Sequence, residues 1–312
     1  MLQAYPYQRL LKIAKYVLLL AISGFIFYKL IYAYKIDQLF REFSRNDHTT
    51  SLWFLFMAIS LVWLNWGIES IKWKYLIEKF EKVSFWNSYK AVLSGVTLSI
   101  ITPNQIGDIA GRIIHLQVLN KIKGSLIMVI GHTAQMLITC FFGIFALWFF
   151  WGQQYGIFLP LLSIVIMSLS IFVYLDLKRV FSKIETISWV RHFEKYLNVF
   201  ASYTPGELLK VLFISFVRYL VFLAQYYFLL KFFDVQVEPF QAIICIMAIF
   251  CIQSVVPSFL LLELGLRGAS ALFVFNWVGI HSAGILLTAY SLWIINIMIP
   301  ALFGMWFIYK VK

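Results

Sequence analysis

Long apolar runs separated by short polar stretches dominate the chain. A helix that crosses the ~30 Å hydrocarbon core of a bilayer needs about 20 mostly apolar residues, because each residue adds about 1.5 Å. Five runs are about this length or longer, and the stretch 268–309, which has no Asp, Glu, Lys or Arg, supplies a sixth span with residues to spare. The five runs are Tyr16–Tyr34, Ser51–Ile68, Ser125–Trp151, Tyr155–Leu175 and Val211–Leu230. The pattern predicts an all-α polytopic membrane protein with about six transmembrane helices.

Two further apolar runs are interrupted by proline. Ala91–Gly107 contains Pro103, and Pro239–Leu262 contains Pro257. Proline inside a helix removes a backbone hydrogen bond and breaks or kinks the helix. Backbone groups freed at membrane depth need protein or a watery cavity to satisfy them. Both runs are therefore predicted to form broken or re-entrant helix pairs.

The placement of Lys and Arg between the runs predicts the orientation. If the N-terminus is cytoplasmic and both broken runs return to the side they entered from, the inner loops receive eighteen cations and the outer loops four. The inner set includes Lys72, Lys74 and Lys79. Cytoplasmic loops of membrane proteins carry this excess. We therefore expect six spans plus two inverted re-entrant pairs, one from each face, with both termini cytoplasmic.

Two polar connections have the spacing of amphipathic surface helices. In 71–88 and in 176–200, apolar and aromatic residues alternate at helical spacing with Lys, Arg and Glu. This pattern is typical of a helix that lies in the membrane interface. The sequence Thr204–Glu207 then has the form of a capping box with proline at the first helical position, which predicts that the next span begins there.

Composition excludes several classes of protein. Of 312 residues, 62% are hydrophobic and only 13% are charged, and the mean hydropathy is +0.84. Ordinary soluble domains have about 25% charged residues. A soluble enzyme, a disordered chain and a nucleic-acid-binding domain are thus excluded, so no nucleic-acid partner is expected. The net charge of +12 is consistent with basic loops that face anionic lipid.

The two broken runs share an arrangement of charges. Pro103 is followed by Asp108 and Arg112, and Pro257 is followed by Glu263 and Arg267. An acid and an arginine four residues apart lie on one helix face and can pair. Charges at membrane depth usually mark functional sites, and broken helices in inverted repeats usually surround them. We interpret 89–123 and 239–275 as pseudo-repeat elements within a single domain, 1–312. The alternative is that each pair satisfies only its own helix end.

Other polar residues are candidates for the same site. His115 continues the stripe of Asp108 and Arg112 at i+7, and Arg218 lies within an apolar span. Arg218 can pair with an acid, bind an anionic headgroup or extend to the interface, and the sequence leaves these three open. Glu69 is a further candidate, whereas Asn65 and Asn296 are interpreted as structural.

These motifs resemble those of the lysylphosphatidylglycerol synthase transmembrane-region family. Residues 102–108 with Arg112 are similar to its "TPGxxGE…R" signature, and Pro257 with 263–268 is similar to its second signature, a proline followed by "GLGxRE". Gly268 stands where the second signature has Glu, and Glu263 is the candidate to supply that acid. The resemblance implies the flippase half of multiple peptide resistance factors, in a bacterial plasma or inner membrane. We expect this chain to lack the soluble synthase domain of those proteins.

The predicted function is a flippase-like lipid translocase rather than an enzyme. It would move a phospholipid or a polyprenyl-phosphate-linked lipid, so the expected partners are membrane lipids with anionic or phosphate-bearing headgroups, with a homodimer to be considered. No cofactor, metal site or catalytic residue is predicted. The expected cavity residues are Asp108, Arg112, His115, Arg218, Glu263 and Arg267, supported by the motif residues Pro103, Gly107, Pro257 and Gly265. The alternative is a membrane enzyme acting on lipid phosphates, either glycosyltransferase-like or phosphatase-like.

Overall fold

The computed structural model describes residues 49–102, 106–119, 121–156, 158–184, 194–256 and 260–310. The chain divides into two units, residues 1–50 and 51–312, and all the described residues except Thr49 and Thr50 belong to the second unit. The first expected span, Tyr16–Tyr34, lies outside the described residues, as do Pro103 and Pro257.

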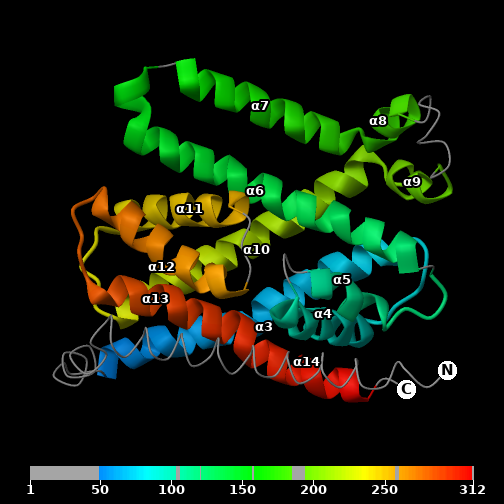
Figure 1. Ribbon diagram of the computed structural model, residues 1–312, viewed down its shortest axis with the longest axis horizontal. Helices are drawn as coiled ribbons and strands as arrows, with labels where there is room; N and C mark the ends of the chain where they lie inside the picture. The colour runs from blue at the N-terminus through cyan, green and yellow to red at the C-terminus, as the bar shows by residue number, and fades with distance from the viewer. Residues whose placement is uncertain are drawn as a thin grey trace, which may run out of the picture. The chain divides into compact units, whose positions relative to one another are not determined.

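Every regular element in the described part of the chain is a helix (Figure 1). In chain order the helices are α3 (Thr49–Ile77), α4 (Phe85–Ile101), α5 (Ile106–Ile113), α6 (Lys121–Tyr155), α7 (Phe158–Leu175), α8 (Leu177–Ile184), α9 (Glu194–Ala201), α10 (Pro205–Phe232), α11 (Pro239–Val255), α12 (Leu260–Asn276), α13 (Ala283–Trp293), the π-helical η3 (Ile294–Met298) and α14 (Ile299–Tyr309). The expectation of an all-α fold is confirmed for these residues.

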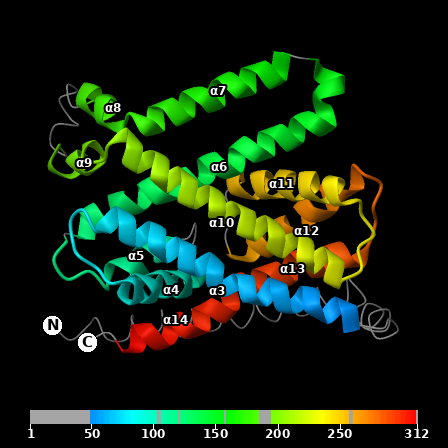
Figure 2. The ribbon, with the colours of Figure 1, turned by 180° about the vertical axis from the view of Figure 1, so that it is seen from behind.

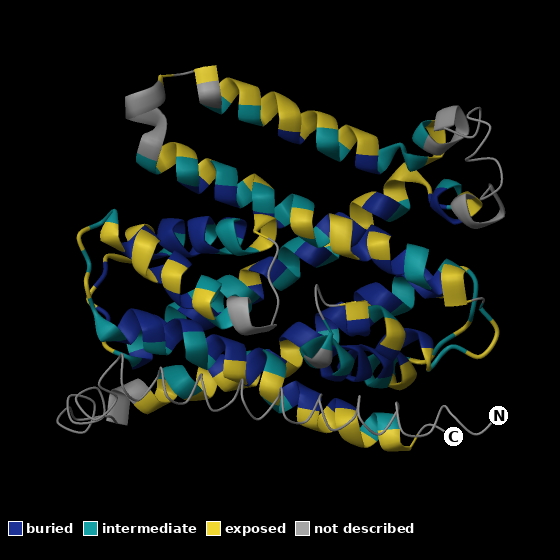
Figure 3. Ribbon diagram, in the orientation of Figure 1, coloured by how far each residue is buried: buried dark blue, intermediate teal, exposed yellow. Residues whose placement is uncertain are grey.

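Three helical segments are long and apolar enough to cross a membrane. They are Leu52–Ile77, Lys121–Phe150 and Ala283–Tyr309, and Pro160–Leu175 and Pro239–Val255 are shorter apolar helices. Large apolar side chains are exposed along α7 and α14, as the yellow residues in Figure 3 show. Soluble proteins seldom expose such continuous apolar faces, whereas a face in contact with hydrocarbon is expected to have them.

The first broken run forms two helices that cross closely. α4 ends at Ile101 and α5 begins at Ile106, so the run forms two helices, as expected, on either side of residues 103–105. The hydroxyl of Thr102 donates to the carbonyl of Leu98 and accepts from the backbone N–H of Gly107 at 2.6 Å. A Cβ added at Gly107 would overlap the Leu98 carbonyl. Glycine at this position therefore allows α5 to lie against α4.

The second broken run also ends one helix and starts another. α11 ends at Val255 and α12 begins at Leu260, with the expected proline between them. α11 packs against α6 and α12, and α12 packs against α13. A Cβ at Gly265 would meet nothing within 4 Å, so packing does not require glycine there. The charge-free stretch 268–309 holds the end of α12 and a continuous rod formed by α13, η3 and α14.

The structure differs from both expectations about surface helices. α3 continues through residues 71–77, and α4 begins at Phe85, so 71–88 is not a separate surface helix. The physical reason is that Lys72 is 1% exposed and neutralised inside the protein, which lets a polar turn stay within a buried helix. The stretch 176–200 forms two short helices, α8 and α9, with 185–193 outside the described residues. The capping box at Thr204–Glu207 is confirmed.

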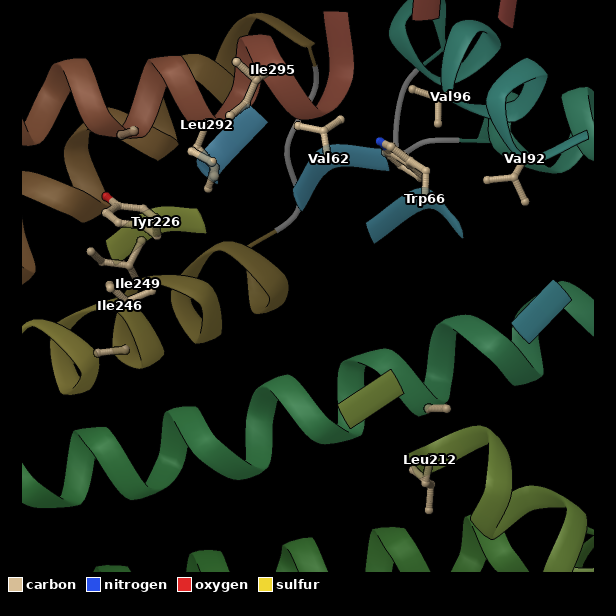
Figure 4. Packing of buried hydrophobic residues seen from close by; sticks show 14 of the residues in the cluster. Val62, Trp66, Val92, Val96, Leu212, Tyr226, Ile246, Ile249, Leu292 and Ile295 are labelled. Carbon is tan, nitrogen blue, oxygen red and sulfur yellow. The ribbon is translucent and has the colours of Figure 1, made fainter. Parts of the chain in front are cut away.

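The core joins helices that are distant in sequence. Seen from behind, α3 and α10 run in front of the other helices (Figure 2). Asn65 of α3 donates to Gln225 of α10 at 3.4 Å and to Asn296 of η3 at 3.2 Å. Figure 4 shows the surrounding apolar packing, with labelled side chains from α3, α4, α10, α11, α13 and η3. Asn65 and Asn296 thus join helices, as the sequence indicated.

Candidate functional site

The first acid–arginine pair lies on α5 and is almost completely buried. Arg112 donates from Nε to Asp108 Oδ1 at 2.9 Å and from Nη2 to Oδ2 at 2.8 Å. The side chains of Arg112 and Asp108 are 4% and 10% exposed. The prediction that residues four apart would pair is confirmed here, and the two parallel hydrogen bonds give the strong bidentate geometry.

Glu69 connects this pair to two other helices. Its Oε1 accepts from Arg112 Nη1 at 2.9 Å, while its Oε2 lies 2.8 Å from Lys72 Nζ and 3.0 Å from Arg218 Nη1. Of the three alternatives for Arg218, the structure therefore shows pairing with an acid, Glu69. Five charged side chains from α3, α5 and α10 thus form one network, which we call the Glu69 cluster: Glu69, Lys72, Asp108, Arg112 and Arg218.

Neutral groups hold the cations of the Glu69 cluster in position. Arg218 Nε donates to Asn65 Oδ1 at 2.8 Å, and its guanidinium lies 5.2 Å from the ring centre of Trp66. The guanidinium of Arg112 lies 5.5 Å from the ring centre of Trp73. Contacts between cations and aromatic faces at such distances are attractive, more so where water is excluded. The arginines are therefore fixed before any ligand arrives.

The second acid–arginine pair, on α12, is more open. Arg267 donates from Nε and Nη2 to the same oxygen of Glu263, at 3.2 and 2.6 Å. Its Nη1 reaches Gln253 Oε1 of α11 only at 3.5 Å. The side chains of Arg267 and Glu263 are 20% and 17% exposed. This pair also forms as expected, but it is less fully engaged than the pair on α5.

His115 lies away from the cluster. Helix α5 ends at Ile113, so His115 sits in the following turn and its ring bonds to Ser94 of α4 at 2.8 Å. The expected helical stripe fails because the helix is too short to reach the i+7 position. His132 of α6 instead meets the cluster, with Nε2 3.2 Å from Asp108 Oδ2. A histidine inside an otherwise uncharged span was the sequence signal that could have indicated it.

Two cavities open beside the Glu69 cluster. The larger, of about 470 Å³, is lined from α3, α5, α6, α10 and α11, and the smaller, of about 220 Å³, from α3, α4, α5, α10, α12, α13 and η3. Both are lined by Trp66, Asp108 and Arg218. Arg112 lines the larger cavity and Arg267 the smaller one. The structure thus brings together four of the six expected cavity residues, whereas Glu263 and His115 are outside the described linings.

The charge of the Glu69 cluster favours an anion. Its three cations, Lys72, Arg112 and Arg218, exceed its two carboxylates by one positive charge when all are ionised. A concave, partly dry site strengthens the attraction of such an excess charge for an oppositely charged ligand. Within the described residues, no group of three or more His, Cys, Asp or Glu side chains could hold a metal ion.

Comparison with known proteins identifies the family. The model of the family described as the lysylphosphatidylglycerol synthase transmembrane region matches residues 16–304. No curated protein and no solved structure matches the chain. The match covers essentially the whole chain, including both broken helix pairs and the Glu69 cluster. The chain belongs to the lysylphosphatidylglycerol synthase transmembrane-region family, a family of membrane domains.

Proposed function

We propose that this chain is a lipid translocase that moves a phospholipid or a polyprenyl-phosphate-linked lipid between leaflets. The observation that carries the proposal is the Glu69 cluster, a buried group of charges with one excess positive charge beside two cavities. A lipid phosphate that leaves the interface needs such a site, because its charge is costly in hydrocarbon. Arginine suits this role since its guanidinium binds phosphate oxygens in pairs.

The broken helices support movement across the membrane rather than binding at one face. Each brings an arginine to the cavities, Arg112 from α5 and Arg267 from α12. In membrane transporters, discontinuous helices surround sites near the midplane. We infer that α4–α5 and α11–α12 are re-entrant pairs that enter from opposite faces and form the pseudo-repeat of a single domain, together with six full spans and cytoplasmic termini in a bacterial plasma membrane.

Cysteine labelling tests this topology. In a chain whose three native cysteines are replaced by alanine, single cysteines are placed at Lys82, in the turn before α4, and at Gln236, in the turn after α10, where both residues are exposed. A membrane-impermeant reagent added to intact cells should label position 236 and should label position 82 only after lysis. Labelling of both positions in intact cells would exclude the topology.

Leaflet exchange tests the function. Full-length protein in liposomes should accelerate the exchange of fluorescent anionic lipids, measured by quenching of the outer leaflet with dithionite. Arg267→Gln should slow exchange about tenfold or more, since hydrogen bonds to charged groups contribute about 1.5–3 kcal/mol. Arg179→Gln is the matched control, because Arg179 also pairs with an acid one turn away, Asp176, but is largely exposed. Equal exchange by both variants and the wild type would contradict the proposal.

An enzyme acting on lipid phosphates is the second candidate. The observation that favours it is the contact of His132 with Asp108 at the edge of the larger cavity, since such pairs can move protons. Release of phosphate, or transfer of a sugar, by purified protein without lipid exchange would establish this alternative in place of translocation.

A further inference from the structure

A titratable side chain, His132, lies at the wall of the larger cavity. It belongs to the apolar part of α6, lines that cavity, and has a side chain that is 45% exposed. Its Nε2 lies 3.2 Å from Asp108 Oδ2, so it also touches the Glu69 cluster. Histidine is the side chain whose charge ordinarily changes between about pH 5 and pH 8. The cavity therefore has a group that can gain or lose a proton near neutral pH.

The contact with Asp108 determines where an added proton is held. Asp108 accepts two hydrogen bonds from Arg112, which identifies it as an ionised carboxylate, and such a group can only accept. His132 Nε2 is therefore the donor, in the neutral ring as well as in the protonated one. The second proton goes to Nδ1, for which no hydrogen bond occurs among the described residues. The ring can thus become charged while its contact with Asp108 stays intact.

The charged groups that face His132 are those of the Glu69 cluster. All five line the same cavity: Glu69 and Lys72 from α3, Asp108 and Arg112 from α5, and Arg218 from α10. The α11 side chains that line it, Gln253 and Ser254, are uncharged. α7 has no charged residue, and its Tyr174 donates to the carbonyl of Ile130. The described side chains of α9, 198–201, are uncharged as well.

A proton on His132 raises the positive charge of this wall. Three cations and two carboxylates leave the Glu69 cluster with one excess positive charge, and a protonated His132 makes it two. Asp108 is already neutralised by Arg112, so the protein itself supplies no unpaired anion for the added charge. An anion in the cavity supplies one. Two ligands that each favour the presence of the other bind with a reciprocal coupling.

Building on the proposed function, we propose that His132 takes up a proton when an anionic lipid headgroup occupies the larger cavity. The proton comes from the aqueous solution and returns to it when the headgroup leaves, and no bond of the lipid is made or broken. The coupling acts through charge, which is effective over several ångströms in a partly dry cavity, so it needs no contact between the ring and the ligand. The proton offsets the negative charge of the headgroup and thereby lowers the cost of carrying it through hydrocarbon.

Equilibrium binding tests this coupling separately from transport. Full-length protein in detergent is titrated with short-chain phosphatidylglycerol, whose phosphodiester keeps the same charge between pH 5.5 and pH 8. The affinity should rise about tenfold from pH 8 to pH 5.5, because one further positive charge then faces the anion. Isothermal titration in two buffers with different heats of ionisation should show that binding takes up protons. An affinity that is independent of pH, without proton uptake, would overturn the proposal.

Two variants assign the proton to His132. His132→Gln keeps an N–H that can donate to Asp108 but cannot become charged, so at every pH it should bind the lipid as the wild type does at pH 8. His132→Arg has a fixed charge and should bind at every pH as the wild type does at pH 5.5. His115→Gln is the matched control, because His115 is half-buried and bonds to the neutral Ser94. It should keep the full dependence on pH. The same dependence in His132→Gln would overturn the assignment.

The outcomes distinguish this inference from the proposed function. Binding that takes up a proton, without accelerated leaflet exchange, would retain the coupling at His132 and overturn the translocase. Accelerated exchange together with binding that is independent of pH would retain the translocase and overturn the coupling alone.

Discussion

The two broken helix pairs carry the same order of charges but bury it to different extents. In α5 the Asp108–Arg112 pair is joined to Glu69 and His132, and its side chains are 10% and 4% exposed. In α12 the Glu263–Arg267 pair has one weak outside contact and is 17% and 20% exposed. Because fewer bonds hold Arg267, it can exchange its partners for a ligand at lower cost. The first pair is thus suited to fix the site and the second to respond to a ligand.

The largest expected difference concerns the arginines themselves. Arg112→Leu leaves Asp108 and Glu69 without their shared partner, and breaking a buried pair in this way costs about 3–5 kcal/mol. Arg267→Leu should lower the free energy of unfolding much less, because Glu263 can be reached by solvent. Thermal unfolding of both variants in the same detergent measures this. Equal losses of stability would remove the distinction between the two pairs.

Replacing a glycine by alanine should lower stability in α5 but not in α12. A Cβ at Gly111 would overlap the carbonyl of Ser94 on α4, and overpacking of this kind costs about 1–3 kcal/mol. Gly265 has open space around it within α12, so alanine there gains up to about 1 kcal/mol from helix propensity. Gly111→Ala should lower the melting temperature and Gly265→Ala should keep or raise it. A loss in both would mean that α12 is packed as closely as α5.

The smallest expected effect on stability concerns Glu81, which binds the loop that follows α5. Glu81 accepts backbone N–H bonds from Gln117, Val118 and Leu119 at 2.8–3.0 Å. Burial alone would raise the pKa of the Glu81 carboxyl, but these backbone bonds, with that of Gln117 the largest, lower it below its ordinary value. Since the folded-state pKa is lowered, the stabilisation is present above the unfolded pKa of about 4.3 and is lost as the pH falls through the folded pKa.

Glu81→Gln measures this contribution. At neutral pH the variant should be less stable by about 1 kcal/mol, the usual scale of a capping interaction. The difference from the wild type should shrink as the pH falls from 7 toward 3, because the wild-type carboxyl then becomes neutral too. A difference that stays constant over this range would show that the shape of the side chain, and not its charge, holds the loop.

Local features of the fold were predictable because they depend on neighbouring residues. The division of each proline-containing run into two helices was expected from the proline, and the capping box at Thr204 and both acid–arginine pairs follow from spacing within one turn. The Glu69 cluster was not predictable, because it depends on how α3, α5 and α10 pack. Lys72 was assigned to a loop for this reason, since its charge alone indicated exposure. His132 was missed and His115 chosen because the end of α5 after Ile113 is not marked in the sequence.

The π-helical stretch Ile294–Met298 places one extra residue in the rod formed by α13, η3 and α14. A π-helix turn closes over five residues where an α-helix closes over four, so the rod from Ala283 to Tyr309 contains one residue more than an α-helix along the same path would need. Deleting one residue within 294–298 would therefore leave Gly304 seated against Leu93 and Thr97, while changing the direction of Asn296. Natural variants that differ by one residue in this rod are expected to differ at this stretch, with the polar connection to Asn65 as the feature that they lose.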